Sequence, residues 1–284
     1  MTFNRPLVMG VLNVTPDSFS DGGQFSAEDD ALNHARLLIA AGSNIIDIGG
    51  ESTRPGAERI SIEEEQRRVL RVIERIAQEP SFIASGAKIS IDTMNSQTAK
   101  AAVACGAEII NDVSGGLADE NMFAVAAESG AILVISHWRG FSDRMDTLNE
   151  YQDIARDVAT ELAVRVEVAI AAGVKREKIV IDPGLGFAKD MQQNWKLVAR
   201  LDELEKLGLP ILVGASRKRF IAGMLEPDEA GEVSNSRRDL ATAVLTALLL
   251  QRKLWGIVNL AKRYPRHFVD DACAQALEHG VHSY

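Results

Sequence analysis

The chain has 284 residues, a formal net charge of −9 and a hydrophobic fraction of 46%. This length suits one large α/β domain or two small ones, and either allows a sizeable buried core. The negative field disfavours nucleic acid and anionic membrane surfaces as partners. It does not exclude a small anionic substrate that local groups bind.

The cysteine content and the apolar segments indicate where the protein works. Cys105 and Cys273 lie far apart without metal-ligand spacing, and so few cysteines fit a reducing cytosol. Residues 1–6 lack the long apolar segment of a signal peptide. The apolar stretch at 241–250 is too short to span a bilayer. We therefore expect a cytoplasmic protein with no membrane partner.

Short apolar runs rich in β-branched residues recur along the chain, as is typical of strands buried on both faces. They occupy residues 7–14, 45–48, 88–91, 108–113, 132–135, 178–181, 210–213 and 255–260. Helical patterns separate them, at residues 27–41, 62–78, 95–105, 121–129, 151–172, 194–207 and 239–252. Alternating units of this number predict a single α/β domain over residues 1–284, with a (β/α)8 TIM-barrel fold. A doubly wound open sheet is the alternative, but no G-x-G-x-x-G follows the first strand.

Two loops follow the first two runs. Turn-forming residues surround Phe19 in the first loop, and this aromatic ring either packs on the core or closes over a ligand. The second loop, residues 49–56, is bracketed by glycines and has Arg54 at its centre. We expect this second loop to close over a site and exclude water.

Polar residues stand at or just past the ends of seven runs. They are Asn13, Asp47 with Glu51, Asp92, Asn111 with Asp112, His137, Asp182, and Ser216 with Lys218. In a barrel these ends converge on the face that carries the active site. A helix cap or turn is the alternative role for Asp47, Asp112 and Ser216.

Three of these residues suggest a ring-binding site. Asp92, Asn111 and Asp182 are expected to project from neighbouring strands into the barrel mouth. Their acceptors and donors suit a heteroaromatic ring with amino and lactam edges, and an amino-rich ligand would satisfy buried carboxylates. A divalent cation such as Mg²⁺ is the competing use of the same oxygens.

The basic run at 216–219 follows the seventh strand, where barrels often bind phosphate. A solvated basic loop is the alternative. No Ser–His–Asp arrangement is evident, and we interpret His137 as a lining residue rather than a base. The pattern indicates catalysis by positioning and electrostatics, on a substrate with a leaving phosphate group.

Six segments together form a specific set of motifs. They are MGVLNVTPDSFSDGG (9–23), IDIGGESTRPG (46–56), IDT (91–93), IINDVSGG (109–116), IDPGLGFAK (181–189) and SRKRF (216–220). Through these motifs, residues 5–256 resemble the bacterial dihydropteroate synthase family. The resemblance implies a TIM barrel that joins 6-hydroxymethyl-7,8-dihydropterin diphosphate to 4-aminobenzoate. The products are 7,8-dihydropteroate and diphosphate, in a step of folate synthesis that sulfonamides target.

The resemblance also implies roles for particular residues, a Mg²⁺ ion and a homodimer. By position, the pterin-binding residues are Asp92, Asn111, Asp182 and Lys218. The aminobenzoate is expected near Phe19, Thr53, Arg54, Pro55, Phe187, Ser216 and Lys218. Asn13 matches the residue near the diphosphate and Mg²⁺, and the implied catalytic residues are Lys218, Asp92 and Arg54.

The end of the chain departs from the family. The family's eighth strand usually carries Arg-x-His-Asp, which binds the diphosphate, whereas this chain has WGIVNLAK at 255–262. Arg266 and His267 come later, out of register, and are the remaining candidates for that role. The tail from about residue 258 does not resemble the family.

Three hypotheses account for this tail. In the first, the tail has diverged and other cations bind the diphosphate instead. In the second, the protein binds pterin but has lost efficient synthesis. In the third, the reading frame shifts near residue 257. A pterin-dependent methyltransferase on the same kind of barrel is a further alternative. The Ser-Arg-Lys anion site argues against that alternative.

Overall fold

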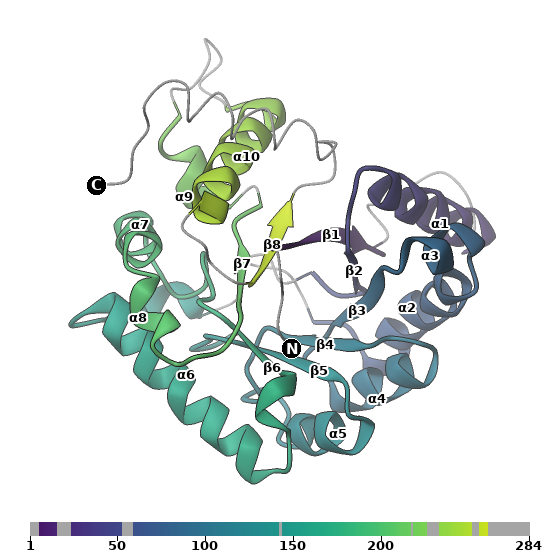
Figure 1. The fold of residues 1–284 in the computed structure, drawn as a ribbon, viewed down its shortest axis with the longest axis horizontal. Helices are drawn as coiled ribbons and strands as arrows, with labels where there is room; N and C mark the ends of the chain where they lie inside the picture. Colours follow the sequence, from purple (N-terminus) through teal and green to yellow (C-terminus); the bar gives the residue numbers. More distant parts are fainter. Residues whose placement is uncertain are drawn as a thin grey trace.

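The computed structural model describes residues 6–15, 24–52, 59–141, 144–216, 218–225, 233–251 and 256–260. In these residues, parallel strands follow one another in chain order around a curled sheet (Figure 1). The first seven are β1 Leu7–Asn13, β2 Ile45–Gly49, β3 Lys88–Asp92, β4 Ile109–Asp112, β5 Ile132–Ser136, β6 Ile179–Asp182 and β7 Ile211–Gly214. The backbone of β8, Gly256–Leu260, pairs in parallel with β1 and with β7, so that the strand order returns to its start.

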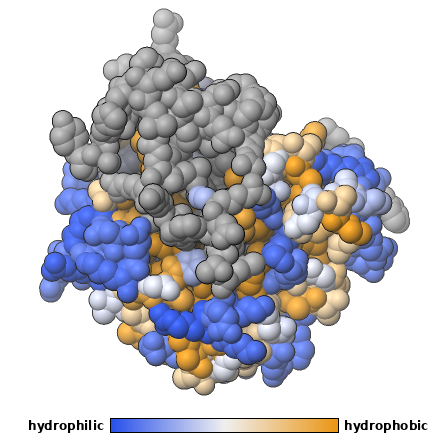
Figure 2. Space-filling model, in the orientation of Figure 1, coloured by the Kyte–Doolittle hydropathy of each residue, from blue (hydrophilic) through white to orange (hydrophobic). Residues whose placement is uncertain are grey.

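Helices surround the outer face of the sheet (Figure 1). They are α1 Gln24–Ala40, α2 Ile62–Ala77, α3 Pro80–Ser85, α4 Ser96–Ala104, α5 Met122–Ser129, α6 Ile154–Ala171, α7 Met191–Ala199, α8 Asp202–Glu205, α9 Arg219–Ala222 and α10 Asn235–Gln251. Short 3₁₀ turns, η2 Met145–Thr147 and η3 Arg176–Lys178, precede α6 and β6. In Figure 2 the coloured surface is hydrophilic over much of its outer rim, with hydrophobic areas between. No helix in the described part of the chain is long and apolar enough to cross a membrane.

The α/β class and the parallel strands predicted from the sequence are confirmed, and the strand bounds agree within one or two residues. The helix predicted at 194–207 is wrong in one respect, since it is divided into α7 and α8. Arg200 leaves the helical conformation there, at φ −122° and ψ 37°. The short helices α3 and α9 were not predicted, because fewer than two turns show no hydrophobic period.

The core has two layers because neighbouring strand residues point to opposite faces of the sheet. The larger layer packs the strands against the surrounding helices. A smaller cluster lies on the inner face and comprises Met9, Ile45, Ile109, Ile132, Val134, Val180 and Leu212. Two residues further along these strands, the same inner face carries Asp47, Asn111, Ser136, Asp182 and Gly214. The alternation of side chains along the strands therefore places the polar residues next to the inner apolar cluster, on the side of the strands' carboxyl ends.

Candidate active site

Asp92 and Asn13 meet at the carboxyl end of β2. A Cβ atom placed on Gly49 would lie 3.5 Å from Asp92 Oδ2 and 3.7 Å from Asn13 Oδ1. The strand register pairs Gly49 with both residues, through β1 on one side and β3 on the other. A side chain at position 49 would fill the space in which these two oxygens converge.

Asn111 is oriented by the carboxylate of Asp47, a strand-end residue to which no ligand was assigned from the sequence. Its Nδ2 atom donates to Asp47 Oδ2 at 3.0 Å. Asp47 is only 3% exposed and lies within β2, so its alternative role as a cap or turn residue is wrong. That role is confirmed for Asp112, whose carboxylate accepts the backbone N–H groups of Ser114 and Gly116.

Asp182 and Lys218 meet over the end of β7. A Cβ atom on Gly214 would lie 3.7 Å from Asp182 Oδ2 and 3.9 Å from Lys218 Nζ. Burial raises the pKa of Asp182, and the nearby Lys218 ammonium opposes that shift. Burial lowers the pKa of Lys218, while the carboxylates of Asp182 and Asp92 oppose it. The pair therefore presents an acceptor and a donor side by side in a poorly solvated place.

The prediction that Asp92, Asn111 and Asp182 come from neighbouring strands is only partly correct. β3 and β4 are adjacent, and the register pairs Asp92 with Asn111. β5 separates β4 from β6, which carries Asp182. The three side chains thus lie on an arc of the inner wall rather than in one row, because the sheet is curled.

Two carboxylate oxygens at this place have no hydrogen-bond partner among the described residues: Asp47 Oδ1 and Asp92 Oδ1. Burial and the charge of Asp47 raise the pKa of Asp92 well above its usual range. Burial raises the pKa of Asp47 to about 6. Buried oxygens of this kind are costly unless a donor reaches them, so the arrangement fits a ligand that brings N–H groups.

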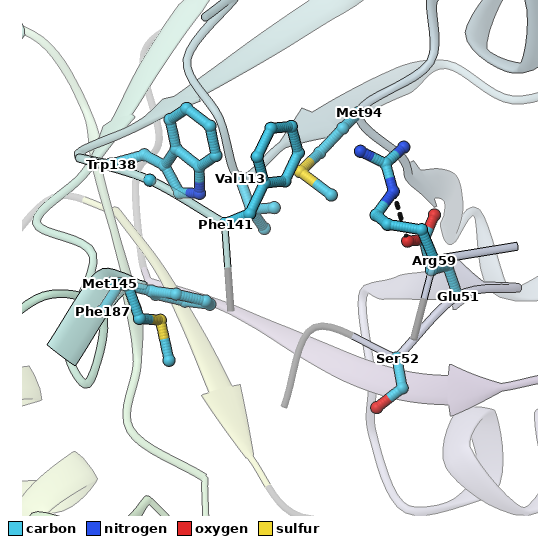
Figure 3. Close-up of a pocket in the computed structure, with 10 residues that line it drawn as sticks. Glu51, Ser52, Arg59, Met94, Val113, Trp138, Phe141, Met145 and Phe187 are labelled. Carbon is cyan, nitrogen blue, oxygen red and sulfur yellow. Dashed lines mark ion pairs between the residues drawn. The ribbon is translucent and has the colours of Figure 1, made fainter. Parts of the chain in front are cut away.

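Phe187 forms one wall beside these groups. Its ring centroid lies 4.7 Å from Lys218 Nζ, and the same ammonium donates to the carbonyl oxygen of Leu185. The ring also lines a pocket that Figure 3 shows, together with Trp138, Phe141 and Met145. An aromatic wall beside a cation and carboxylates suits a flat aromatic ligand.

Arg59 and Glu51 lie at the opposite side of this pocket (Figure 3). Their side chains form an ion pair at 2.6 Å, and Arg59 also lies 5.0 Å from the ring centroid of Phe141. Arg59 Nη2 donates to Asn95 Oδ1 at 3.2 Å. The pair therefore connects the segments that follow β2, β3 and β5. Sequence reasoning missed Arg59, because nothing in its local sequence distinguishes it from a surface arginine.

The oxygens of Asn13 and Asp92 are the kind of ligand that Mg²⁺ takes. Where the structure describes side chains, no three of His, Cys, Asp or Glu gather as a metal cage. Mg²⁺ does not need one, since it keeps waters and takes one or two protein oxygens plus substrate phosphates. The converging oxygens of Asn13 and Asp92 fit that kind of site.

Several predicted site residues fall outside the described residues: Phe19, Thr53, Arg54, Pro55, Arg266 and His267. Ser216 is described, two residues after the end of β7. His137 is 3% exposed and hydrogen-bonded to Lys189 and Glu161. Low exposure does not separate His137 from the mouth, because Asp47 is equally buried, so its interpretation as a lining residue rather than a base stays a prediction.

Comparison with known proteins identifies the class of enzyme to which this arrangement belongs. The model of the pterin-binding enzyme family matches residues 9–258, and the chain belongs to that family. The match ends where the sequence analysis found that the resemblance stops.

The relatives are dihydropteroate synthases. The enzyme of Mycobacterium leprae is 45% identical over 251 residues, which cover 88% of this chain and 86% of the relative. The Xanthomonas albilineans enzyme, solved with 4-aminobenzoic acid, superposes with a TM-score of 0.82 at 34% identity, over 98% of this chain and 95% of that one. The Anaplasma phagocytophilum enzyme, solved with 6-hydroxymethylpterin-monophosphate, superposes with a TM-score of 0.80 at 33% identity. The superposition covers 96% of this chain and 98% of that one.

Proposed function

We propose that this chain is a dihydropteroate synthase. It condenses 6-hydroxymethyl-7,8-dihydropterin diphosphate with 4-aminobenzoate and releases 7,8-dihydropteroate and diphosphate. The membership of the pterin-binding family and the identity of the relatives support the activity. The ligands named for the two solved relatives, an aminobenzoic acid and a pterin phosphate, correspond to the two halves of the product.

The convergence of Asp92, Asn111, Asp182 and Lys218 at one mouth is the observation that carries the proposal. These are the residues that the family resemblance assigns to the pterin. The carboxylates accept from the amino and ring N–H groups of the pterin, and Asn111 and Lys218 donate to its acceptor atoms. The buried oxygens of Asp92 and Asp47 then gain the donors that they lack in the free protein.

The reaction needs little acid–base chemistry from the protein. The bond between the exocyclic carbon and the diphosphate oxygen breaks, and the arylamine nitrogen then bonds to that carbon and gives a proton to the released diphosphate. The carboxylates of Asp92 and Asp182 stabilise the positive charge that develops on the pterin as diphosphate leaves. Phe187 and Lys218 form the wall against which the aminobenzoate ring packs. Catalysis then comes from positioning and from fixed charges.

We also propose a Mg²⁺ ion, held by Asn13 with the diphosphate of the substrate. When bound, it supplies charge neutralisation for the leaving diphosphate. Arg54 and Ser216 belong to the same proposal, as residues around the aminobenzoate. So do Phe19, Thr53 and Pro55 beside the aminobenzoate, and Arg266 or His267 near the anion.

The remaining parts of the proposal concern the whole molecule. The pairing of β8 with β1 and β7 supports a complete (β/α)8 barrel formed by a single domain. A homodimer, a cytoplasmic location and inhibition by sulfonamides stay predictions from the family resemblance.

The decisive experiment is diphosphate release by the purified protein with Mg²⁺, the pterin diphosphate and 4-aminobenzoate, beside a reaction without aminobenzoate. We expect release that depends on aminobenzoate. Pterin binding without release would instead favour the second candidate, a pterin-binding homologue that has lost synthesis. The absent Arg-x-His-Asp motif at 255–262 is the observation that favours this second candidate.

A further inference from the structure

Lys189 is a buried cation that the proposed mechanism does not use. The residue is 8% exposed, and its Nζ atom lies within hydrogen-bond distance of three acceptors. They are His137 Nδ1 at 2.9 Å, the Gly184 carbonyl oxygen at 3.0 Å and the Phe187 carbonyl oxygen at 3.0 Å. An ammonium group has three N–H donors, so this environment satisfies it completely.

The Lys189 ammonium contacts His137, and His137 in turn contacts Glu161. His137 Nε2 lies 3.0 Å from Glu161 Oε2, and burial together with the Lys189 charge lowers the pKa of His137 to about 4. A neutral ring that donates from Nε2 to a carboxylate has its free lone pair on Nδ1, where Lys189 donates. Arg139 donates to the same carboxylate through Nε and Nη2. Burial lowers the pKa of Lys189 well below its usual range, and the negative charge of Glu161 opposes that shift while it also binds Arg139.

The two carbonyls that Lys189 binds belong to the turn after β6. Gly184 has φ +64°, and a Cβ atom there would lie 2.1 Å from the His137 carbonyl oxygen. Ala188 has φ +47°, a conformation that costs a residue with a Cβ and persists only where the surroundings impose it. Tyr151 imposes it in part, because its hydroxyl donates to the Ala188 carbonyl at 3.0 Å. Side chains therefore hold the turn together with its own backbone hydrogen bond, from the Phe187 N–H to the Gly184 carbonyl at 3.1 Å.

This turn determines where Phe187 lies. The residue sits between the two carbonyls of Gly184 and Ala188, and its own carbonyl is one of the acceptors of Lys189. Its ring faces the pocket and lies 4.7 Å from Lys218 Nζ. The Leu185 carbonyl, in the same turn, accepts from Lys218. A change in the turn thus reaches both groups of the aromatic wall.

We propose that Lys189 is a positioning residue for the aminobenzoate half of the reaction. Held by His137 and Glu161, its ammonium sets the turn that presents Phe187 to Lys218 and to the arylamine. Lys189 does not touch substrate, because its donors are directed to the backbone and to His137. The inference rests on the proposed synthase activity for its kinetic consequence, but its structural consequence is independent of it.

The kinetic test replaces Lys189 by methionine, which keeps the length and apolar volume and removes the three donors. We expect the KM for 4-aminobenzoate to rise about tenfold or more, as for the loss of hydrogen bonds to a charged group. The KM for pterin diphosphate should change by less than about threefold. Of the four residues assigned to the pterin, Asp92 and Asn111 are held by the strand register and by Asp47. Asp182 and Lys218 contact the turn at the Gly184 N–H and the Leu185 carbonyl, which Lys189 does not bind, so we expect a smaller effect on the pterin than on aminobenzoate.

Two comparisons separate positioning from general loss of stability. Arg176→Met removes a cationic donor to a backbone carbonyl, that of Leu207, beyond the amino end of the same strand β6. Both kinetic constants of this variant should stay within about twofold of the unchanged chain. Glu161→Gln keeps the size of the carboxylate and removes its charge, and we expect a smaller rise in the KM for aminobenzoate than Lys189→Met produces.

The structural test is a pair of crystal structures, of the unchanged chain and of Lys189→Met. We expect the Phe187 ring to move away from Lys218 in the variant. An unmoved ring, or a rise in both KM values to the same extent, overturns the positioning role. An unchanged chain that releases no diphosphate refutes the proposed function instead, and the position of Phe187 still decides the inference.

Discussion

Asn111 donates its side-chain N–H to Asp47 across the inside of the sheet, from β4 to β2, at a distance of 3.0 Å. The bond fixes which end of the Asn111 amide faces Asp47, and it leaves the second N–H of Nδ2 and the oxygen Oδ1 to the ligand. Asp47 therefore decides how the amide of Asn111, a residue assigned to the pterin, is presented.

Asp47→Ala should weaken pterin binding by about tenfold, which is the scale of one hydrogen bond to a charged group. The control is Asp47→Asn, which keeps an acceptor for Asn111 and should stay within about threefold. Calorimetric titration with the pterin diphosphate measures both variants. Equal affinities for Asp47→Ala and the unchanged chain would show that Asn111 needs no orientation.

Asp182→Ala should abolish measurable pterin binding, because it removes the carboxylate that faces the ring beside Lys218. The matched control is Asp202→Ala, an exposed aspartate at the start of α8, which should bind normally. Direct titration with the pterin diphosphate gives the answer. Unchanged affinity in Asp182→Ala refutes the assignment of this residue to the ring.

Lys218→Ala should cost about 2 kcal/mol or more of transition-state stabilisation, or roughly 30-fold in kcat/KM. The loss has two causes, since the ammonium stabilises the ionised form of Asp182 and packs on the ring of Phe187. Lys206→Ala provides the comparison, because Lys206 pairs with Glu203 on the surface at 2.5 Å. An effect of less than about twofold for Lys218→Ala would mean that this lysine is only a loop cation.

His137 should make the fold sensitive to acid. Its pKa is lowered from the ordinary value of 6.5 to about 4 by burial and by Lys189, so the unfolded chain binds the proton first. Stability then falls as the pH drops from about 6.5 to about 4, by an amount on the order of 3 kcal/mol. Above that window the contribution is fully present.

Urea denaturation between pH 4 and pH 7 tests this, with His137→Gln as the comparison. Glutamine bonds the same partners without titrating, so its stability should depend less on pH in that window. Titrating groups away from His137, Asp47 among them, are common to both chains and cancel in the difference. Glu161 does not cancel, because the hydrogen bonds from His137 and Arg139 lower its pKa to about 2 against the effect of burial. Parallel curves for the two chains would refute the assignment to His137.

Glu65 should contribute strongly to stability without touching the site. It is fully buried in α2, and its carboxylate accepts from Thr93 at 2.7 Å, Asn95 at 2.8 Å and Thr98 at 2.6 Å. Glu65→Ala leaves those three donors unpaired and should cost about 3 kcal/mol in the free energy of unfolding. Glu63→Ala, at an exposed position of the same helix, should cost no more than about 0.5 kcal/mol. Similar losses in both variants would contradict the role of the buried network.

The sequence alone predicted the parallel strands, most of the helices and the residues that end the strands. The reason is physical, since strands buried on both faces must be continuous apolar runs, and parallel strands bring their carboxyl ends to one face. Asp92, Asn111, Asp182 and Lys218 were found in this way. The family motifs then supplied the substrate, which spacing and periodicity did not indicate by themselves.

Other features depended on contacts between distant segments, which no local pattern records. Asp47 reads as a turn residue until β4 brings Asn111 to it, and Arg59 reads as a surface cation until Glu51, Asn95 and Phe141 surround it. Lys189 is the last residue of the motif IDPGLGFAK, and nothing in the sequence around it indicates that the residue is buried.

The sequence by itself thus determined which residues lie at the mouth, because strand alternation and strand ends are properties of one segment. Only the tertiary structure decided how those residues are oriented and charged. Orientation and pKa depend on burial and on partners from other strands, as for His137 between Lys189 and Glu161.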